Sequence, residues 1–269
     1  MPNPFSYENK RVVVTGCFSG VGAALVEVLA ELGVAHVTAI DVKKPDGKID
    51  RFFATDLSDP AAIDATVSAI DGPVDALFSN AGVAANAGLE VLMGVNYLAL
   101  RRIVDGLLPK VAPGGAIAVT ASMAGNGWPA HQAEIMELLA IDGWEESLAW
   151  LTSHPELLGE PYGFSKELAQ MYTMQASRMV AEAGARINSV CPGIIQTPLL
   201  TDFRATMTDA LIDWTIGQSR LAEPRQIANV LAFLGSDASS FMNGSNVLAD
   251  AGFTSALTTG QIDFSGLAH

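Results

Sequence analysis

The segment from residue 11 to residue 33 constrains the fold of this chain more than any other. Residues 11–15 form a β-branched run that predicts a buried strand, and residues 23–32 show helical periodicity. Glycines in the loop between them let the backbone turn tightly and approach a pyrophosphate, whose charge is met by amides at the helix N-terminus. An ordinary strand-to-helix turn is the alternative interpretation. The predicted pyrophosphate loop comprises Gly16, Ser19, Gly20, Val21 and Gly22.

Apolar runs and turn signals divide the rest of the chain into strands and helices. Strands are predicted at residues 35–40, 49–54, 74–79, 116–121 and 186–190, with a last one between Asn243-Gly244 and Asp250. Helices are predicted at residues 60–70, 89–111, 162–183 and 224–234. No internal repeat or linker interrupts this order. Because α/β folds of 269 residues are commonly one domain, we expect a single domain over residues 1–269.

Asp41 ends the second predicted strand, 19 residues beyond Gly22. A carboxylate at this position can accept hydrogen bonds from the ribose hydroxyls of an adenosine, and it would repel a 2'-phosphate. Lys43 and Lys44 follow and can partly offset that repulsion, so the sequence favours NAD without excluding NADP. Asp41 could also simply end a strand in water.

Later strand ends carry further candidates for the same ligand. Asp56 and Leu57 could bracket an adenine ring, and the small residues of Asn80-Ala81-Gly82 leave room for a cofactor. Ser122 lies at the C-terminal end of a strand, where ligands sit in open parallel sheets, although a serine there could equally form a turn. The loop after the sixth strand could also carry the ligand, through Pro192, Gly193, Ile195 and Thr197.

Tyr162 and Lys166 lie four residues apart on a predicted helix and therefore share one face. An ammonium group near a tyrosine favours the phenolate and lowers the tyrosine pKa, so that Tyr162 could give or take a proton. The alternative is a surface helix on which the two are merely neighbours. Asn96 stands inside the predicted helix 89–111, where asparagine is unfavourable unless its side chain or the local backbone is used.

The charge balance excludes several classes of partner. The chain has 15 Lys and Arg against 29 Asp and Glu, a net charge of −14, which would repel nucleic acid and anionic membrane surfaces. Cys17 and Cys191 lie far apart without spacing suited to a metal, so we expect reduced thiols and no metal site. Residues 1–10 lack the apolar core of a signal peptide, and charged residues and a histidine interrupt the apolar stretch 21–40. We expect a cytoplasmic protein.

Taken together, these motifs resemble the short-chain dehydrogenase/reductase family from Arg11 to Gly252. The glycine loop matches the family's TGxxxGxG, and residues 80–82 match its NAG. The family's catalytic four correspond to Asn96, Ser122, Tyr162 and Lys166, and Pro192-Gly193 with Thr197 fits its loop beside the nicotinamide. Five weak signals in the right order make coincidence improbable.

The resemblance implies a doubly wound Rossmann sheet of about seven strands and hydride exchange between a nicotinamide nucleotide and an alcohol or carbonyl. It implies that Tyr162 transfers the proton, with Ser122 hydrogen-bonding the reacting oxygen. Lys166 would bind the nicotinamide ribose and lower the Tyr162 pKa, and Asn96 would hold a water that links Lys166 to solvent. The spacing of Tyr162 and Lys166 argues against enoyl reductases, and the loop spacing argues against the extended epimerases. A nucleotide-sensing regulator without turnover remains the alternative function.

The chain departs from the family pattern by an insertion at residues 128–161, before the catalytic tyrosine. It holds three of the four tryptophans and resembles that of 3α-hydroxysteroid dehydrogenase/carbonyl reductases and coniferyl-alcohol dehydrogenases. We expect short amphipathic helices there that alter the subunit contacts usual for the family, in a homo-oligomer (dimer or tetramer). A second departure is Ala251, where many members carry glycine.

The substrate is expected to be a neutral or weakly polar alcohol or ketone with an aromatic or alicyclic ring. Basic residues are scarce near the predicted pocket, with Arg204 the obvious exception, and this disfavours multiply anionic substrates. The segments expected to wall the pocket contribute Met123, Trp128, Phe203, Met207 and Trp214. Such apolar walls suit ringed ligands, although these side chains could also fill the core.

Overall fold

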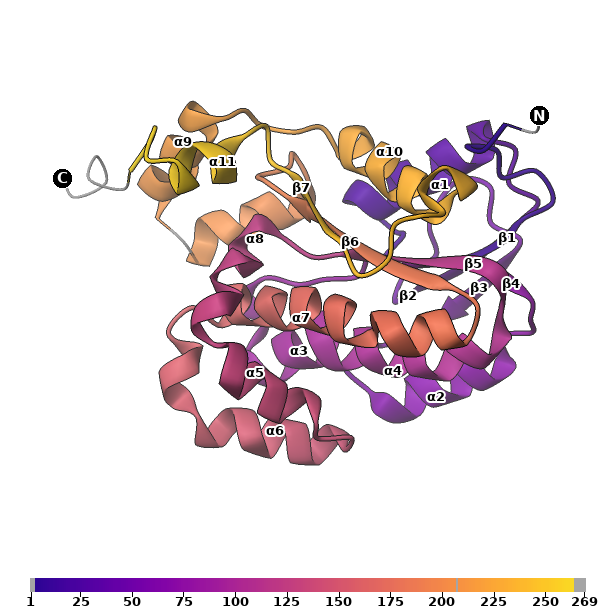
Figure 1. Ribbon diagram of the computed structural model, residues 1–269, viewed down its shortest axis with the longest axis horizontal. Coiled ribbons are helices and arrows are strands. Elements are labelled where there is room, and N and C mark those ends of the chain that lie inside the picture. The colour runs from indigo at the N-terminus through magenta and orange to yellow at the C-terminus, as the bar shows by residue number, and fades with distance from the viewer. Residues whose placement is uncertain (1–2, 207, 264–269) are drawn as a thin grey trace.

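The computed structural model describes residues 3–206 and 208–263, and one parallel sheet of seven strands runs through its centre (Figure 1). The strands are β1 Arg11–Thr15, β2 His36–Asp41, β3 Arg51–Ala54, β4 Val74–Ser79, β5 Val111–Thr120, β6 Arg186–Pro192 and β7 Asn246–Ala249. Their order in the sheet is β3-β2-β1-β4-β5-β6-β7. The order therefore reverses between β1 and β4, which is the point where open α/β sheets bind ligands.

Helices cover both faces of the sheet. One face carries α1 Gly20–Glu31 and α10 Pro224–Gly235, and the opposite face carries α2 Pro60–Ala69, α4 Ala99–Leu107 and α7 Pro161–Glu182 (Figure 1). Each layer closes its own apolar core, one around Leu25 and Leu231 and the other around Leu107 and Leu168. The predicted fold class, a doubly wound sheet with helices on both faces, is confirmed. Shorter helices complete the chain at α3 Leu89–Met93, α8 Pro198–Thr206, α9 Asp209–Gln218 and α11 Phe253–Thr258.

The predicted helix 89–111 is interrupted. Between α3 and α4 the backbone forms a π-helical turn over Gly94–Leu98, with the buried Asn96 inside it. The Asn96 side chain accepts a hydrogen bond from the Val83 amide (2.8 Å) and donates one to the Val83 carbonyl (3.0 Å). Helical turns of this kind are frequent at functional sites. The polar side chain therefore marked a real irregularity that the apolar pattern concealed.

Strand β5 and the C-terminal helices also differ from the sequence prediction, which named neither α8 nor α9. Strand β5 begins at Val111 rather than Ala116, because its first pairing with Val74 is followed by a shift of register at Ala76. Helix α11 was not predicted. It follows two residues with left-handed backbone, Ala251 and Gly252, and side-chain periodicity does not predict a helix that starts after such a turn.

The insertion folds into helices, as predicted. Helices α5 Gln132–Leu139 and α6 Trp144–Ser153 lie below α7 and α3 in Figure 1 and bury their apolar sides against them. Trp144 is buried, and a side chain at Gly94 would meet its ring at 3.2 Å. Arg101 on α4 fastens the turn between the two helices, donating 2.6 Å hydrogen bonds to the Ile141 carbonyl and the Asp142 carboxylate. The insertion is therefore a packed part of the fold.

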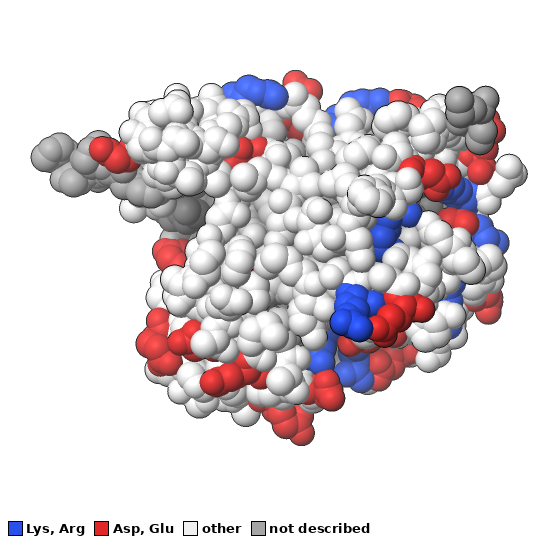
Figure 2. All heavy atoms as spheres, viewed as in Figure 1, with Lys and Arg blue, Asp and Glu red and all other residues white. Residues whose placement is uncertain are grey.

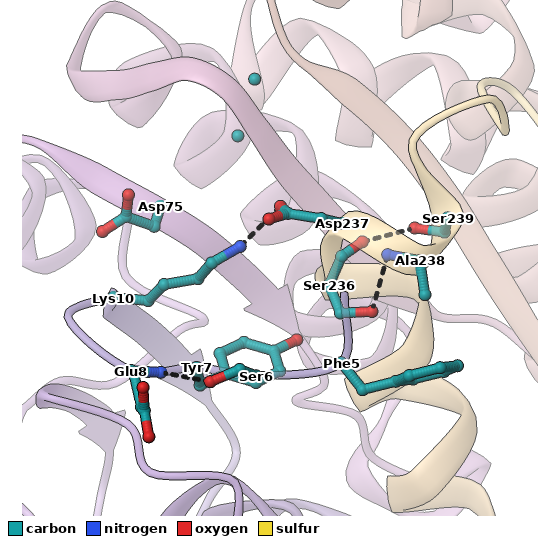
Figure 3. A network of polar contacts seen from close by, with 12 residues as sticks. Phe5, Ser6, Tyr7, Glu8, Lys10, Asp75, Ser236, Asp237, Ala238 and Ser239 are labelled. Carbon is teal, nitrogen blue, oxygen red and sulfur yellow. Dashed lines mark hydrogen bonds and ion pairs between the residues drawn. The ribbon is translucent and has the colours of Figure 1, made fainter. Parts of the chain in front are cut away.

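The N-terminal segment is anchored at the opposite edge of the sheet from the ligand loops. The Tyr7 ring is fully buried, and its hydroxyl donates a hydrogen bond to the Ala232 carbonyl at 2.7 Å. Lys10 pairs with Asp237 at 2.6 Å, as Figure 3 shows beside Ser236 and Ser239. Asp237 is largely exposed, so this ion pair contributes at most about 1 kcal/mol and burial of Tyr7 contributes more.

Charged side chains lie mainly around the rim of the face seen in Figure 1. Figure 2 shows the middle of this face, where α7 runs, with few charged atoms despite the net charge of −14. None of the helices in the described residues is long and apolar enough to cross a membrane.

Candidate active site

A cavity of about 1170 Å³ opens at the C-terminal ends of the central strands. The loops after β1, β2, β4, β5 and β6 form one half, and α8, α9 and α11 wall the other. Most of the residues predicted from sequence line it: Gly16, Ser19, Gly20, Val21, Asp41, Asp56, Leu57, Asn80, Ala81, Gly82, Ser122, Tyr162, Lys166, Pro192, Gly193, Ile195 and Thr197. Of the predicted catalytic and cofactor-binding residues, Gly22 and Asn96 do not line it.

The glycine loop is shaped by close backbone approaches. Gly16 has a φ of 65°, and a Cβ there would lie 2.5 Å from the Cα of Ala81. Gly22 faces inward, where a Cβ would lie 2.0 Å from the Gly16 carbonyl oxygen. Gly22 therefore lets the loop fold onto α1 rather than touching a ligand itself. Ser19 precedes α1 without capping it through its side chain, so the amides of this helix N-terminus stay available to an anion.

Asp41 is held at the end of β2 beside this loop. Its carboxylate accepts a 2.9 Å hydrogen bond from the Phe18 amide and a 3.3 Å bond from the Lys43 amide. The Lys43 ammonium lies over the Phe18 ring, 5.3 Å from its centroid. Lys43 lines the cavity, whereas Lys44 does not. The two groups proposed to act on the adenosine end, one acidic and one basic, are thus both in place.

These observations fit a dinucleotide cofactor. The glycines, which have no side chains, leave room for a pyrophosphate at a helix N-terminus. The Asp41 carboxylate lines the cavity next to the expected position of the adenosine ribose. Asn80 ties the loop after β1 to the end of β5. Its amide donates to the Gly16 carbonyl (2.9 Å), and its side-chain oxygen accepts from the Thr120 hydroxyl (3.0 Å). The half of the cavity that fits the cofactor is therefore formed by residues at the ends of the central strands.

The first turns of α7 present Tyr162 and Lys166 to the cavity, as the four-residue spacing predicted. The Lys166 ammonium lies 5.7 Å from the centre of the Tyr162 ring and donates to the Thr120 carbonyl at 3.2 Å. Burial lowers the pKa of Lys166 to about 8. Burial raises the pKa of Tyr162 to about 12, and a hydrogen bond with the Ser122 hydroxyl acts against that rise.

The pKa of Tyr162 differs from the sequence expectation. The group that lowers it here is Ser122, and enclosure of the hydroxyl outweighs that effect. Lys166 is 4% exposed, with its ammonium directed to the Thr120 carbonyl. At neutral pH Tyr162 therefore carries its proton and can act as an acid.

Asn96 reaches the site from behind. Its amide donates to the Ser165 hydroxyl at 3.0 Å, and that hydroxyl donates to the Tyr162 carbonyl at 2.7 Å. A Cβ at Gly82 would lie 3.4 Å from both the Asn96 side-chain oxygen and the Lys166 nitrogen. Asn96 thus braces the backbone around Tyr162 instead of forming the cavity wall.

Fewer of the residues expected to wall the substrate half line the cavity. Met123 and Phe203 line the cavity, and the Phe203 ring meets the Tyr162 ring edge-on at 4.7 Å. Trp128 and Trp214 do not line it, because Trp128 packs against the core and Trp214 against the Phe253 ring. Met207 lies outside the described residues.

Arg204 does not line the cavity either. Its guanidinium donates to the carboxylates of Asp209 (2.6 Å) and Asp213 (2.7 Å), which neutralise it. The scarcity of positive charge in the substrate half is therefore greater than the sequence suggested.

Sequence reasoning missed several residues of this half. Asn126 and Thr254 line the cavity, and Gln170 supports them from α7. No spacing rule links these three, because they meet only when the loop after β5, helix α7 and helix α11 pack together. The missed apolar wall consists of Leu199, Leu200, Leu211, Ile212, Phe253 and Leu257. Within residues 3–206 and 208–263, no group of three or more His, Cys, Asp or Glu side chains could hold a metal ion.

Fold and site together define a nicotinamide-dependent dehydrogenase, and comparison with known proteins agrees. A family model described as short chain dehydrogenase matches residues 10–133, and one described as Enoyl-(Acyl carrier protein) reductase matches residues 147–254. Coniferyl-alcohol dehydrogenase from Pseudomonas sp. (strain HR199) is 33% identical, covering 92% of this chain and 97% of that protein. Cis-4-hydroxycyclohexanecarboxylate dehydrogenase from Sinomonas cyclohexanicum is 32% identical, covering 93% and 98%.

A solved structure agrees with these relatives. The 3-alpha-hydroxysteroid dehydrogenase from Pseudomonas sp. B-0831, complexed with NADH, is 28% identical with a TM-score of 0.76, covering 94% of this chain and all of that one. The chain belongs to the short-chain dehydrogenase family. It is an NAD(P)-dependent oxidoreductase acting on CH–OH groups. The four-residue spacing of Tyr162 and Lys166 is that of the simple oxidoreductases rather than the enoyl reductases.

Proposed function

We propose that this enzyme uses NAD to interconvert a neutral, ring-bearing alcohol and its carbonyl compound. The observation that carries the proposal is the position of Tyr162, which lines the cavity, hydrogen-bonds Ser122 after β5 and meets the Phe203 ring of α8. On one side lie the glycine loop and Asp41, and on the other lies a wall of leucine, isoleucine and phenylalanine side chains. An apolar wall with few polar groups suits a flat or alicyclic ring.

The chemistry follows from the protonation states of the site. A bound nicotinamide supplies the hydride in the reductive direction and accepts it in the oxidative one. Tyr162, protonated at neutral pH, gives its proton to the carbonyl oxygen, and the Ser122 hydroxyl donates a hydrogen bond to the same oxygen as charge develops. Lys166 holds a positive charge beside the reacting group below pH 8. Asn96 keeps Tyr162 in position through Ser165.

The relatives named above support a ring in the substrate without fixing its charge: they are named for coniferyl alcohol, cis-4-hydroxycyclohexanecarboxylate and a 3-alpha-hydroxysteroid. Other relatives are named for meso-2,3-butanediol, sorbose and D-threitol, so neutrality is inferred from the pocket. The cations lining the cavity are Lys43, at the adenosine end, and Lys166, while the exposed Glu160 adds negative charge on the substrate side. A neutral ring therefore suits this pocket better than a carboxylate.

Replacement of the tyrosine tests the enzymatic role. Tyr162→Phe removes only the proton-transfer group, so it should lower kcat about 10²- to 10⁴-fold and leave the Kd for NAD within twofold. The measurement is NADH absorbance with a panel of ringed, short aliphatic and sugar alcohols. A variant that retains more than about a tenth of the wild-type rate would refute the assignment.

The rival function is a nucleotide-sensing regulator with this fold but no turnover. It is disfavoured because Ser122, Tyr162 and Lys166 are all present and meet at one cavity. A regulator would bind NAD and oxidise none of the alcohols in the panel. A preference for a sugar or phosphate ester would instead overturn the proposed substrate class.

A further inference from the structure

The substrate half of the cavity contains few polar groups, and most of them are already engaged. The hydroxyls of Thr206 and Thr215 donate to carbonyls of their own helices, at 3.1 Å and 2.8 Å. Thr258 and Glu160 are exposed residues at the edge of the cavity. The remaining polar pair, Asn126 and Thr254, lies in the wall itself.

Hydrogen bonds fix the orientation of this pair. Gln170, which is 1% exposed, donates from its amide to the side-chain oxygen of Asn126 at 3.1 Å. The Asn126 amide in turn donates to the Thr254 hydroxyl oxygen at 3.1 Å. The backbone of Thr254 is held by the buried Asp250 carboxylate, which accepts from the Thr254 amide at 2.9 Å. Neither side chain is therefore free to turn away from the cavity.

This arrangement leaves hydrogen-bond donors unused. The Thr254 hydroxyl acts as an acceptor, and its own proton has no acceptor among residues 3–206 and 208–263. The Asn126 amide has two protons, of which one is bound to Thr254 within the same described ranges. These half-buried donors are already oriented toward the cavity, so a ligand atom that accepts their protons in place of water would gain about the net free energy of a neutral hydrogen bond.

The pair is also fixed relative to the reacting group. The same Gln170 amide that holds Asn126 donates to the Ser122 carbonyl at 2.8 Å. Ser122 and Asn126 lie at the start of one 3₁₀-helical segment, Met123–Ala130, which Ser122 caps by accepting from the Ala124 amide. Donors held at a fixed distance from the catalytic hydroxyl can favour substrates whose second oxygen lies at the matching distance from the reacting one.

We propose that Asn126 and Thr254 form a donor pair that binds a neutral oxygen on the substrate ring, remote from the reacting alcohol. This inference rests on the proposed function and narrows its substrate class to rings that bear a hydroxyl, ether or carbonyl oxygen. Both donors are neutral, and the cations on the cavity wall lie elsewhere, so the site does not compensate a carboxylate.

The test uses alcohols that differ at one ring position. Cinnamyl alcohol and its 4-hydroxy and 4-carboxy derivatives are oxidised with NAD, and kcat/KM is compared. Wild type should prefer the 4-hydroxy compound over the parent about threefold to tenfold, the range of one net neutral hydrogen bond, and disfavour the 4-carboxy compound. Most of the preference should appear in KM, because the ring oxygen takes no part in the reaction.

Three variants locate the preference. Thr254→Val removes the hydroxyl at nearly constant volume and should bring the ratio of the 4-hydroxy compound to the parent close to one. Thr254→Ser keeps the hydroxyl and should keep the ratio. Thr259→Val is the matched control, because this threonine follows α11, lies outside the cavity wall and donates to the Ser255 carbonyl at 2.8 Å. It should keep the wild-type ratio.

The possible failures are distinguishable. If wild type oxidises both alcohols at the same kcat/KM, or if Thr254→Val keeps the preference, the donor pair is refuted and the proposed function stands. An equal loss with both alcohols in Thr254→Val assigns the threonine a structural role and also refutes the pair. If wild type oxidises neither alcohol, the inference fails; if it also oxidises no other ringed alcohol of the panel with NAD or NADP, the proposed function fails with it.

Discussion

The ammonium nitrogen of Lys166 lies 3.2 Å from the carbonyl oxygen of Thr120, in a position where the lysine is only 4% exposed. One carbonyl replaces the hydration shell that this charge would have in water. Burial accordingly lowers the lysine pKa from 10.5 to about 8, which corresponds to roughly 3 kcal/mol of folding free energy at about 1.4 kcal/mol per pH unit. The site thus keeps a charge that costs stability.

Lys166→Met should make the ligand-free protein more stable at pH 7, by about 1–3 kcal/mol, while abolishing turnover. Below pH 8 both folded and unfolded chains carry the charge, so wild type bears the full cost there. Between pH 8 and 10.5 only the unfolded lysine keeps its proton, so the cost shrinks as the pH rises. Urea unfolding at pH 7, 9 and 10 measures the difference, with the exposed Lys44→Met as control. If Lys166→Met raises the free energy of unfolding by the same amount at all three pH values, the buried-charge explanation is contradicted.

The cofactor preference should depend on two residues of opposite charge. Asp41 faces the adenosine end and should favour NAD, so Asp41→Ala should narrow the ratio of kcat/KM for NAD to that for NADP by about tenfold or more, equivalent to about 1.4 kcal/mol. Lys43 lines the cavity and should act in the opposite sense, so Lys43→Met should widen the ratio. Lys44→Met is the matched control, because Lys44 does not line the cavity. A wild-type preference for NADP would show that Lys43 dominates.

Most residues that the sequence proposes for the cofactor half line the cavity, because they stand at or near the C-terminal ends of strands. Asp41 and Asn80 are placed by the parallel sheet alone, whose strand ends all meet at one edge. The apolar pattern did not predict the π-helical turn at Asn96, because apolar periodicity does not show where a helical turn contains one extra residue. Only the unfavourable asparagine signalled it.

The substrate half could not be derived in the same way. Its residues come from helices whose angle to the sheet is set by tertiary packing. Phe203 and Trp214 are both aromatic residues of one apolar segment, yet the Phe203 ring contacts Tyr162 and the Trp214 ring contacts Phe253. The donor pair of Asn126 and Thr254 joins segments 128 positions apart. Hydrogen bonds of this kind carry no local sequence pattern.

Ala251 is expected to be a strained position. Its φ of 55° lies in the left-handed region, which costs a residue with a Cβ roughly 1–2 kcal/mol, and the family often has glycine here. Ala251→Gly should therefore stabilise the fold by up to about 1 kcal/mol after the larger entropy of the unfolded glycine is offset. Ala256→Gly, inside α11, should destabilise it by about 0.5–1 kcal/mol and serves as the control. Equal destabilisation by both would show that Ala251 bears no strain.

The last prediction concerns the insertion and the assembly of the protein. Helices α5 and α6 pack against α3 and α7, with Trp144 against Gly94, and Arg101 on α4 holds the turn between them through the Ile141 carbonyl. In the family these neighbouring helices commonly pair between subunits, so the insertion should prevent that contact and leave the oligomer to form elsewhere.

Replacing residues 132–158 by a short glycine-serine linker should therefore change the molar mass measured by light scattering, because it uncovers the apolar sides of α3 and α7. Asp142→Ala removes only the exposed end of the Arg101 contact and should leave the molar mass as in wild type. Circular dichroism and NAD binding establish that the shortened chain is folded. If it is folded and its assembly is unchanged, the insertion does not set the subunit contacts, and its part lies in the active site, where Glu160 and Pro161 reach the cavity.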